Sequence, residues 1–216
     1  MLSPIHADAI VAQSRFLHER RLLVSADGNL SCRLDDGSIL ITPSGLNKSR
    51  LGPQDLALIR LDGEILLGKP SSERLMHLEI YRQVPEARAI THAHPPHAIA
   101  LSLARPYWKH LPVDGLPEVL IAAGEIPVVP YARPGTEKMG TALRPFLPAS
   151  RLMILARHGA VCWGESLDET VDGIERLEQI CQILSLAESM GGTTPLPAGE
   201  LQALRQLRQK LGPRIL

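Results

Sequence analysis

The sequence has few aromatic residues and no surplus of charge of either sign. Only 3% of its 216 residues are Phe, Trp or Tyr, so an extended platform of rings for stacking nucleic-acid bases is not expected. Lys plus Arg and Asp plus Glu each number 23, and the formal net charge is +0. A chain without a basic excess lacks the electrostatic signature of nucleic-acid binding or of attraction to anionic membranes. Any phosphate group would therefore have to be bound by a local site.

Cysteine and long apolar runs are also scarce. The three cysteines, Cys32, Cys162 and Cys181, are far apart, and none belongs to a CxxC pair. An odd number of scattered thiols argues against a disulfide framework and a thiolate zinc site, and it favours a reducing compartment. No apolar run approaches the roughly 20 residues of a membrane helix, and the N-terminal segment lacks the apolar core of a signal peptide. We therefore expect a soluble, cytoplasmic protein.

Strand and helix patterns alternate along the chain. Apolar positions at helical spacing predict a helix from about residue 5 to 21, and Ser166 is expected to cap a long helix that reaches about residue 190. Asp35-Asp36-Gly37 predicts a hairpin turn between two short strands. Further strands are expected at 56–61, 87–92, 152–156 and 160–163, and further helices at 71–81, 96–103, 136–146 and 198–211.

Because several of the expected strands form hairpins, the pattern favours an α/β protein with a mixed sheet covered by helices over a purely parallel sheet. The chain shows no internal repeat and no break in composition. Its length therefore favours a single domain over residues 1–216. The core of this domain would span about residues 5–190, and a basic amphipathic helix at 198–211 would form a C-terminal tail.

The sharpest candidate for a functional site is His92-Ala93-His94. Two histidines two positions apart on an extended segment point to the same face, so both imidazoles can reach one cation. The expected strand ends here, and sites in α/β folds gather at such strand ends. Taken alone, the pair could equally be two ordinary histidines at the end of a strand.

A third histidine, His158, lies on a turn between two apolar strands. Three histidines that leave a fourth position open are typical of a catalytic zinc site rather than a structural one. Without the other two, His158 would be read as an ordinary turn residue. His97 could contact the metal ligands without binding the metal itself. The remaining histidines considered are expected on the surface: His6, His18, His77 and His110.

Glu73 is the candidate for a fourth group. It is expected at a helix N-terminus, where the helix dipole favours a carboxylate, although acidic residues are common in such positions. Ser71 and Ser72, with the free N–H groups of the same helix end, could bind a phosphate. Two turn-rich loops offer further backbone donors, and each would be an ordinary turn by itself: Asp27-Gly28-Asn29 and Pro43-Ser44-Gly45.

Taken together, five stretches resemble the class II aldolase/adducin family, whose enzymes include L-fuculose-phosphate aldolase. The stretches occur in the family's order and with similar spacing, from about residue 5 to 190. They are Gly28-Asn29-Leu30-Ser31, Thr42-Pro43-Ser44-Gly45, Pro70-Ser71-Ser72-Glu73, His92-Ala93-His94 and His158-Gly159.

The resemblance implies a three-layer α/β/α fold and a homo-oligomer, usually a tetramer with active sites between subunits. It implies that His92, His94 and His158 bind a divalent metal, generally Zn2+, with Mn2+ or Co2+ as alternatives. Glu73 would be the acid/base residue and would ligate the metal when substrate is absent. The phosphate pocket would consist of Gly28, Asn29, Ser44, Gly45, Ser71 and Ser72.

The reaction that the resemblance implies is cleavage of a ketose 1-phosphate, of the fuculose-, ribulose- or deoxyribulose-phosphate type, to dihydroxyacetone phosphate and an aldehyde. The metal would stabilise the enediolate charge left when the C3–C4 bond breaks, and Glu73 would return a proton to that carbon. Two features depart from the fuculose-phosphate aldolases. Glu118 best matches the position of a tyrosine that the neighbouring subunit contributes near the aldehyde oxygen, and the C-terminal tail has no tyrosine. Tyr131 or Tyr107 could substitute.

Other activities of the family are weighed against the same residues. Pentulose-phosphate epimerases have Asp after the paired serines, so Glu73 argues against them, and the intact Ser71-Ser72-Glu73 argues against the related decarboxylases of sugar-acid phosphates. A methylthioribulose-1-phosphate dehydratase shares the metal set and the glutamate and remains a rival. An adducin-like binding module is expected to lack the metal ligands. We therefore expect a small-molecule sugar phosphate as partner, and neither nucleic acid nor membrane.

Overall fold

The computed structural model describes residues 4–212. Within that range, eight strands form one sheet in the order β4-β3-β2-β1-β5-β8-β7-β6. Neighbouring strands are antiparallel except β6 and β7, which are parallel. The predicted mixed, largely antiparallel sheet is therefore confirmed. The strands are β1 (Asn29–Arg33), β2 (Ile39–Ile41), β3 (Ala57–Ile59), β4 (Ile65–Leu67), β5 (Ala89–Ala93), β6 (Val128–Val129), β7 (Leu152–Leu155) and β8 (Gly159–Gly164).

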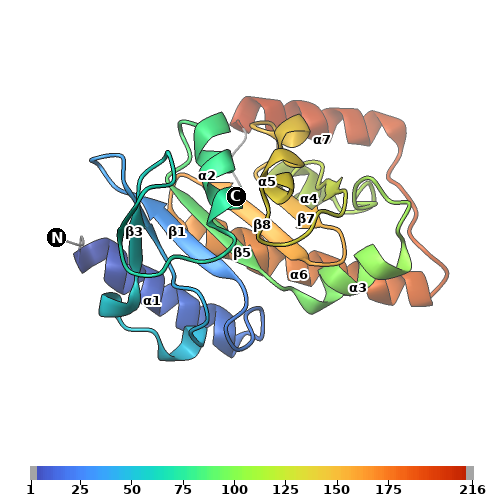
Figure 1. Cartoon of the computed structure of the whole chain (residues 1–216). Coiled ribbons are helices and arrows are strands. Elements are labelled where there is room, and N and C mark those ends of the chain that lie inside the picture. The colour runs from blue at the N-terminus through green and yellow to red at the C-terminus, as the bar shows by residue number, and fades with distance from the viewer. Residues whose placement is uncertain (1–3, 213–216) are drawn as a thin grey trace.

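Helices cover both faces of this sheet (Figure 1). One hydrophobic cluster joins one face of the sheet to α1 (Pro4–Glu19), α3 (Pro96–Ala104), α4 (Pro117–Ala122), α6 (Leu167–Ser189) and α7 (Ala198–Leu211). A second cluster joins the other face to α2 (Arg74–Gln83) and α5 (Glu137–Thr141). Short 3-10 helices lie at η1 (Lys48–Arg50), η2 (Pro53–Asp55) and η3 (Arg144–Phe146).

The alternation of side chains along β7 shows why three layers form. Leu152 and Ile154 pack into the first cluster, and Met153 and Leu155 pack into the second. Successive side chains of a strand point to opposite faces of the sheet, so a strand that is apolar throughout needs helices on both sides. Each of these fully buried side chains stabilises the fold by about 1.5–3 kcal/mol relative to exposure.

Three elements differ from the predictions. Helix α2 begins at Arg74, and its N-cap residue is Glu73, which makes no side-chain capping hydrogen bond. Edge strand β4 was not predicted, because its three apolar residues are all exposed and show no alternation. Helix α4 was missed because it begins at Pro117 in a segment rich in proline and glycine. None of the helices within residues 4–212 combines the length and apolarity needed to cross a membrane.

The ends of three neighbouring strands meet near the start of α2. Asn29 at the start of β1 pairs with His92 near the end of β5, and His92 pairs in turn with Val161 near the start of β8. Antiparallel pairing therefore brings motifs that are far apart in the sequence together at the ends of these central strands.

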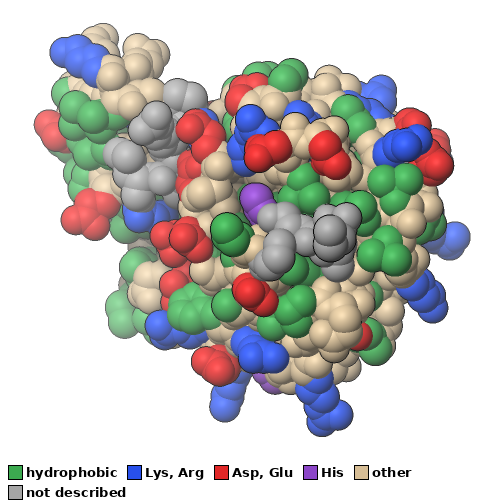
Figure 2. Space-filling view, turned by 90° about the vertical axis from the view of Figure 1, so that its left-hand side faces the viewer, with side chains coloured by type: hydrophobic (Ala, Val, Ile, Leu, Met, Phe, Trp, Pro, Cys, Tyr) green, Lys and Arg blue, Asp and Glu red, His purple; other side chains and the backbone are tan. Residues whose placement is uncertain are grey.

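Figure 2 shows Lys and Arg side chains intermixed with Asp and Glu side chains over the face turned to the viewer. Mixed charges of this kind give little long-range attraction for an anion. Recognition of a phosphate would then depend on donors in a particular cavity.

Candidate active site

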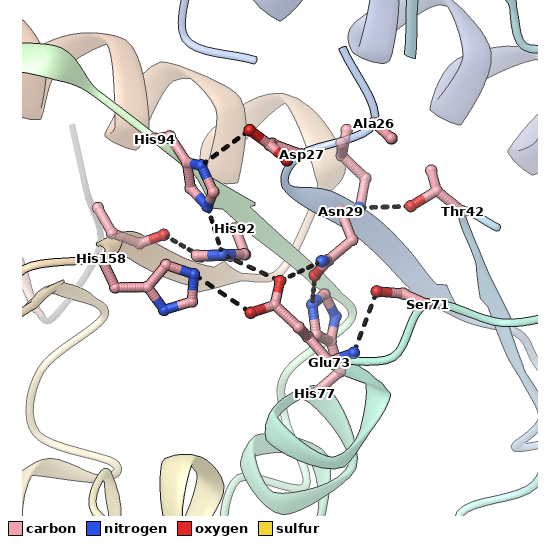
Figure 3. A network of polar contacts seen from close by, with 12 residues as sticks. Ala26, Asp27, Asn29, Thr42, Ser71, Glu73, His77, His92, His94 and His158 are labelled. Atoms are coloured by element: carbon pink, nitrogen blue, oxygen red, sulfur yellow. Dashed lines mark hydrogen bonds and ion pairs between the residues drawn. The ribbon is translucent and has the colours of Figure 1, made fainter. Parts of the chain in front are cut away.

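The imidazole rings of three histidines meet at the end of β5 (Figure 3). His92 is on β5, His94 follows directly after it, and His158 lies on the turn between β7 and β8. The ring centroids are 5.0 Å apart for His92 and His94, 4.8 Å for His92 and His158, and 5.0 Å for His94 and His158. One nitrogen from each ring lies within 4.8 Å of the others, so the three could hold one metal ion.

Two glycines make this close packing possible. A Cβ atom at Gly159 would lie 2.4 Å from the Ala93 carbonyl oxygen and 2.8 Å from His94 Cδ2. Gly28 has a φ of +66°, and a Cβ there would lie 2.7 Å from the His92 carbonyl oxygen. Any side chain at either position would therefore displace the backbone that carries the histidines.

His94 and His158 have the protonation state that metal ligands need, and a hydrogen bond orients the ring of His92. His92 donates from Nδ1 to the Ala160 carbonyl oxygen at 2.8 Å, so its Nε2 is an acceptor, and this atom lies 3.2 Å from His94 Nε2. Burial, with the nearby His92, lowers the pKa of His94 to about 3 and that of His158 to about 4. Both rings are therefore neutral at pH 7, as metal coordination requires.

Glu73 faces this histidine cluster. Its Oε2 accepts a hydrogen bond from Asn29 Nδ2 at 2.8 Å and lies 3.2 Å from His92 Nε2. Its Oε1 lies 3.2 Å from His158 Nε2 and has no hydrogen bond from any residue described. Burial alone raises the pKa of the Glu73 carboxyl, but His92, His158 and the Asn29 amide together hold it well below its usual range.

A carboxylate and neutral imidazole nitrogens thus face one another at short distances. Each imidazole and the carboxylate can offer an electron pair to a cation that lies among them. A divalent metal with affinity for nitrogen ligands, such as zinc, fits this set of donors.

A buried chain of hydrogen bonds holds Asn29, the residue that donates to Glu73. His77 donates from Nε2 to Asn29 Oδ1 at 2.5 Å, which turns the amide of Asn29 toward Glu73. His77 Nδ1 lies 2.7 Å from Ser31 Oγ, which in turn lies 2.9 Å from the Tyr81 hydroxyl. The prediction that His77 lies on the surface is wrong, because this residue is 0% exposed. Its place four residues after Glu73, on the same helix face, was the available signal.

We expect a His77→Leu substitution to lower the free energy of unfolding by about 2–4 kcal/mol, since each buried polar group left without a partner costs about 1–3 kcal/mol. Asn29 Oδ1 loses the donor His77 Nε2, and Ser31 Oγ loses one of its two partners and keeps the Tyr81 hydroxyl. Urea denaturation followed by circular dichroism measures the change, with the exposed His110→Leu as control. A His77→Leu protein as stable as wild type would mean that this chain contributes little to folding.

The histidine cluster opens into a cavity of about 470 Å³. Glu73, His94 and His158 line it, whereas His92 is fully buried at its base. The residues predicted for the phosphate pocket line the same cavity: Gly28, Asn29, Ser44, Gly45, Ser71 and Ser72. Pro134 and Gly135, after β6, form a further wall that the sequence analysis missed. Nothing in their sequence pattern indicated that wall.

The side chains considered for the aldehyde oxygen lie elsewhere in this chain. Glu118 is in the first turn of α4, and Tyr107 and Tyr131 are 73% and 62% exposed. All three are outside the set of residues that line the cavity. His97 also lies away from the cavity, where its Nδ1 is 2.7 Å from Glu178 Oε1.

Comparison with known proteins agrees with the fold and with the motifs. The model of the Class II Aldolase and Adducin N-terminal domain matches residues 8–185. The 3-oxo-tetronate 4-phosphate decarboxylase of Escherichia coli (strain K12) is 36% identical over 208 residues, which cover 90% of this chain and 92% of the relative. The 5-deoxy-D-ribulose 1-phosphate aldolase of Bacillus thuringiensis serovar kurstaki is 30% identical, over 94% of this chain and 95% of the relative.

A solved structure of L-fuculose 1-phosphate aldolase superposes with a TM-score of 0.85 at 27% sequence identity, covering 95% of this chain and 97% of the other. The fold is thus shared with a sugar-phosphate aldolase. The chain belongs to the class II aldolase/adducin family.

Proposed function

We propose that this chain is a metal-dependent lyase that decarboxylates a 3-oxo sugar-acid phosphate of the 3-oxo-tetronate 4-phosphate type. The observation that carries the proposal is the 36% identity to a 3-oxo-tetronate 4-phosphate decarboxylase over 90% of this chain. Three histidines, Glu73 and the phosphate loops supply what an enediolate needs. A departing CO2 requires no further proton transfer, whereas aldol cleavage also requires a base that takes the proton of the C4 hydroxyl as the aldehyde forms.

The expectation that this chain is not a decarboxylase of a sugar-acid phosphate is corrected by the similarity to such an enzyme. The intact Ser71-Ser72-Glu73 was taken as evidence against these decarboxylases, yet this chain is 36% identical to a decarboxylase over most of its length. That similarity supports decarboxylation, and the glutamate is compatible with it for a chemical reason.

Decarboxylation and aldol cleavage pass through the same enediolate. In a 3-oxo-tetronate 4-phosphate, the C1–C2 bond breaks, C1 leaves as CO2, and its electron pair forms an enediolate across C2 and C3. In a ketose 1-phosphate, the C3–C4 bond breaks, an aldehyde leaves, and the same kind of enediolate remains across C2 and C3. One proton added to the carbanionic carbon gives dihydroxyacetone phosphate in both reactions.

Glu73 would deliver that proton, which its carboxylate would first take up from solvent. Asn29 holds Oε2 by a hydrogen bond, whereas Oε1 has no hydrogen bond from the described residues and is the oxygen free to carry a proton to C2. Residues of the loops at 26–29, 43–45 and 71–72 would bind the phosphate and orient C2 toward Glu73. A divalent cation held by His92, His94 and His158 would supply a Lewis acid for the developing oxyanion.

The second candidate is the ketose 1-phosphate aldolase implied by the family resemblance. Similarity to the 5-deoxy-D-ribulose 1-phosphate aldolase over nearly the whole chain favours it. It would require, in addition, a base that takes the proton of the C4 hydroxyl as the aldehyde forms. The methylthioribulose-1-phosphate dehydratase remains a third activity to assay.

The proposal extends to the metal and the assembly. Imidazole ligands suit zinc, with manganese and cobalt as alternatives. A homotetramer in the cytoplasm is what the family resemblance implies.

We expect the zinc-loaded protein to convert 3-oxo-tetronate 4-phosphate into equal amounts of CO2 and dihydroxyacetone phosphate. A coupled enzymatic assay measures the triose phosphate, and a bicarbonate assay measures the CO2. Triose phosphate from ketose 1-phosphates, with no CO2 from the oxo acid, would instead establish the aldolase. Water loss from methylthioribulose 1-phosphate alone would contradict both.

A further inference from the structure

Lys48 is a buried lysine that none of the motifs includes. It begins η1, is 1% exposed, and directs its ammonium group at three backbone carbonyls. Nζ donates to the oxygens of Ala26 at 2.9 Å, Leu46 at 3.1 Å and Pro43 at 3.4 Å. A lysine is rarely buried without a partner of opposite charge, so this arrangement requires an explanation.

The carbonyls that Lys48 holds belong to two loops of the cavity. Ala26 precedes Gly28 in the first loop, and Pro43 precedes Gly45 in the second. Ala26 and Pro43 are 17 positions apart in the sequence, and the ammonium group of Lys48, which is not among the residues that line the cavity, joins their loops. The relative position of these loops therefore depends on Lys48.

The charge of Lys48 is not balanced by an ion pair. Among the residues the structure describes, no carboxylate lies within ion-pair distance of Nζ. Burial lowers the pKa of Lys48 to about 8, and the more distant Asp27 and Glu73 oppose that change. A buried ammonium is costly unless an anion comes close, and the adjacent cavity is the place for one.

The cavity also offers hydrogen-bond donors without acceptors. Within residues 4–212, the backbone N–H groups of Gly28, Gly45 and Ser72 have no hydrogen-bond acceptor. These groups lie on the loops at 26–28 and 43–45 and beside Ser71. A phosphate dianion, which has oxygen acceptors on every side, suits such donors.

We propose that Lys48 is the buried cation of the phosphate site, a positioning residue that joins the two loops and offsets the charge of a bound phosphate without touching it. The inference rests on the proposed function insofar as the substrate carries a phosphate group. It applies equally to a decarboxylase and to an aldolase, so the substrate assays above do not decide it.

Binding of inorganic phosphate to the zinc-loaded protein, measured by isothermal titration calorimetry, tests the proposal. We expect a Lys48→Met substitution to raise the Kd for phosphate about tenfold or more, because a charge near the dianion is lost. The bound zinc should stay unchanged, since the histidines are untouched. Lys69→Met, which removes an exposed lysine one residue before Pro70, is the matched control and should stay within about twofold.

A folded, zinc-loaded Lys48→Met protein that binds phosphate as tightly as wild type would overturn the proposal. Absence of phosphate binding by the wild type would overturn the phosphate pocket and the proposal with it. Failure of 3-oxo-tetronate 4-phosphate to react, with phosphate binding intact, would instead count against the decarboxylase alone.

A measurement on the wild type covers the case in which Lys48→Met does not fold. The chain has five lysines, and the other four are exposed, so Lys→Arg substitutions at those positions identify the Lys48 signal in a spectrum of 13C-labelled lysine: Lys69, Lys109, Lys138 and Lys210. Saturating phosphate should raise the pKa of Lys48 by about half a unit or more, because a nearby anion favours the charged form. A lysine with only a structural role would show no change, and that result would contradict the proposal.

Discussion

Replacement of Glu73 by Gln is expected to lower turnover by about 10²–10⁴-fold, the usual contribution of a positioned general acid or base. The amide cannot carry the proton to C2, although it has nearly the same shape. Binding of inorganic phosphate should be retained, because the phosphate loops do not depend on the charge of Glu73. Steady-state release of dihydroxyacetone phosphate from the zinc-loaded protein measures the first effect, and calorimetry measures the second.

Two comparisons make the Glu73→Gln result specific. Glu86→Gln changes an exposed glutamate and should leave turnover at the wild-type value. The zinc content of Glu73→Gln must be determined as well, because loss of metal would lower the rate for another reason. Nearly full turnover by the metal-loaded Glu73→Gln protein would mean that this residue is only the N-cap of α2.

Much of the candidate site could be predicted because its residues occur in short, local patterns. The spacing of His92 and His94 on an extended segment places both rings on one face, and this follows from strand geometry alone. The loops around Gly28 and Gly45 could be predicted because they consist of residues that favour turns. Strand and helix patterns were likewise sufficient for the mixed sheet and for α7, which spans Ala198–Leu211 as predicted.

The supporting residues could not be predicted, because their roles arise from tertiary contacts. Lys48 has no motif, and only the folded chain shows that its ammonium group joins loops at Ala26 and Pro43. His77 was placed on the surface, since burial of a histidine depends on partners from another element, here Ser31 and Asn29 of β1. Such buried polar groups break the apolar pattern on which prediction of the core rests.

Replacement of His158 by Ala is expected to remove the bound metal and to lower turnover by about 10³-fold or more, since a metal Lewis acid contributes several kcal/mol and each 1.36 kcal/mol is a factor of ten. His92 is on β5 and His94 directly follows that strand, so His158 is the ligand that closes the site from the β7–β8 turn. Elemental analysis after dialysis against metal-free buffer measures the metal content of both proteins.

The metal can also be detected through stability, without any substrate. Zinc at about 1,000 times its Kd should stabilise the wild type by about 4 kcal/mol, which raises its melting temperature, whereas His158→Ala should show a much smaller shift. His110→Ala, which removes an exposed histidine far from the cluster, should behave like wild type in both measurements. Stoichiometric zinc and an unchanged thermal shift in His158→Ala would show that the three histidines do not act as one metal site. Because one nitrogen of each of the three rings lies within 4.8 Å of the others, the opposite result is expected.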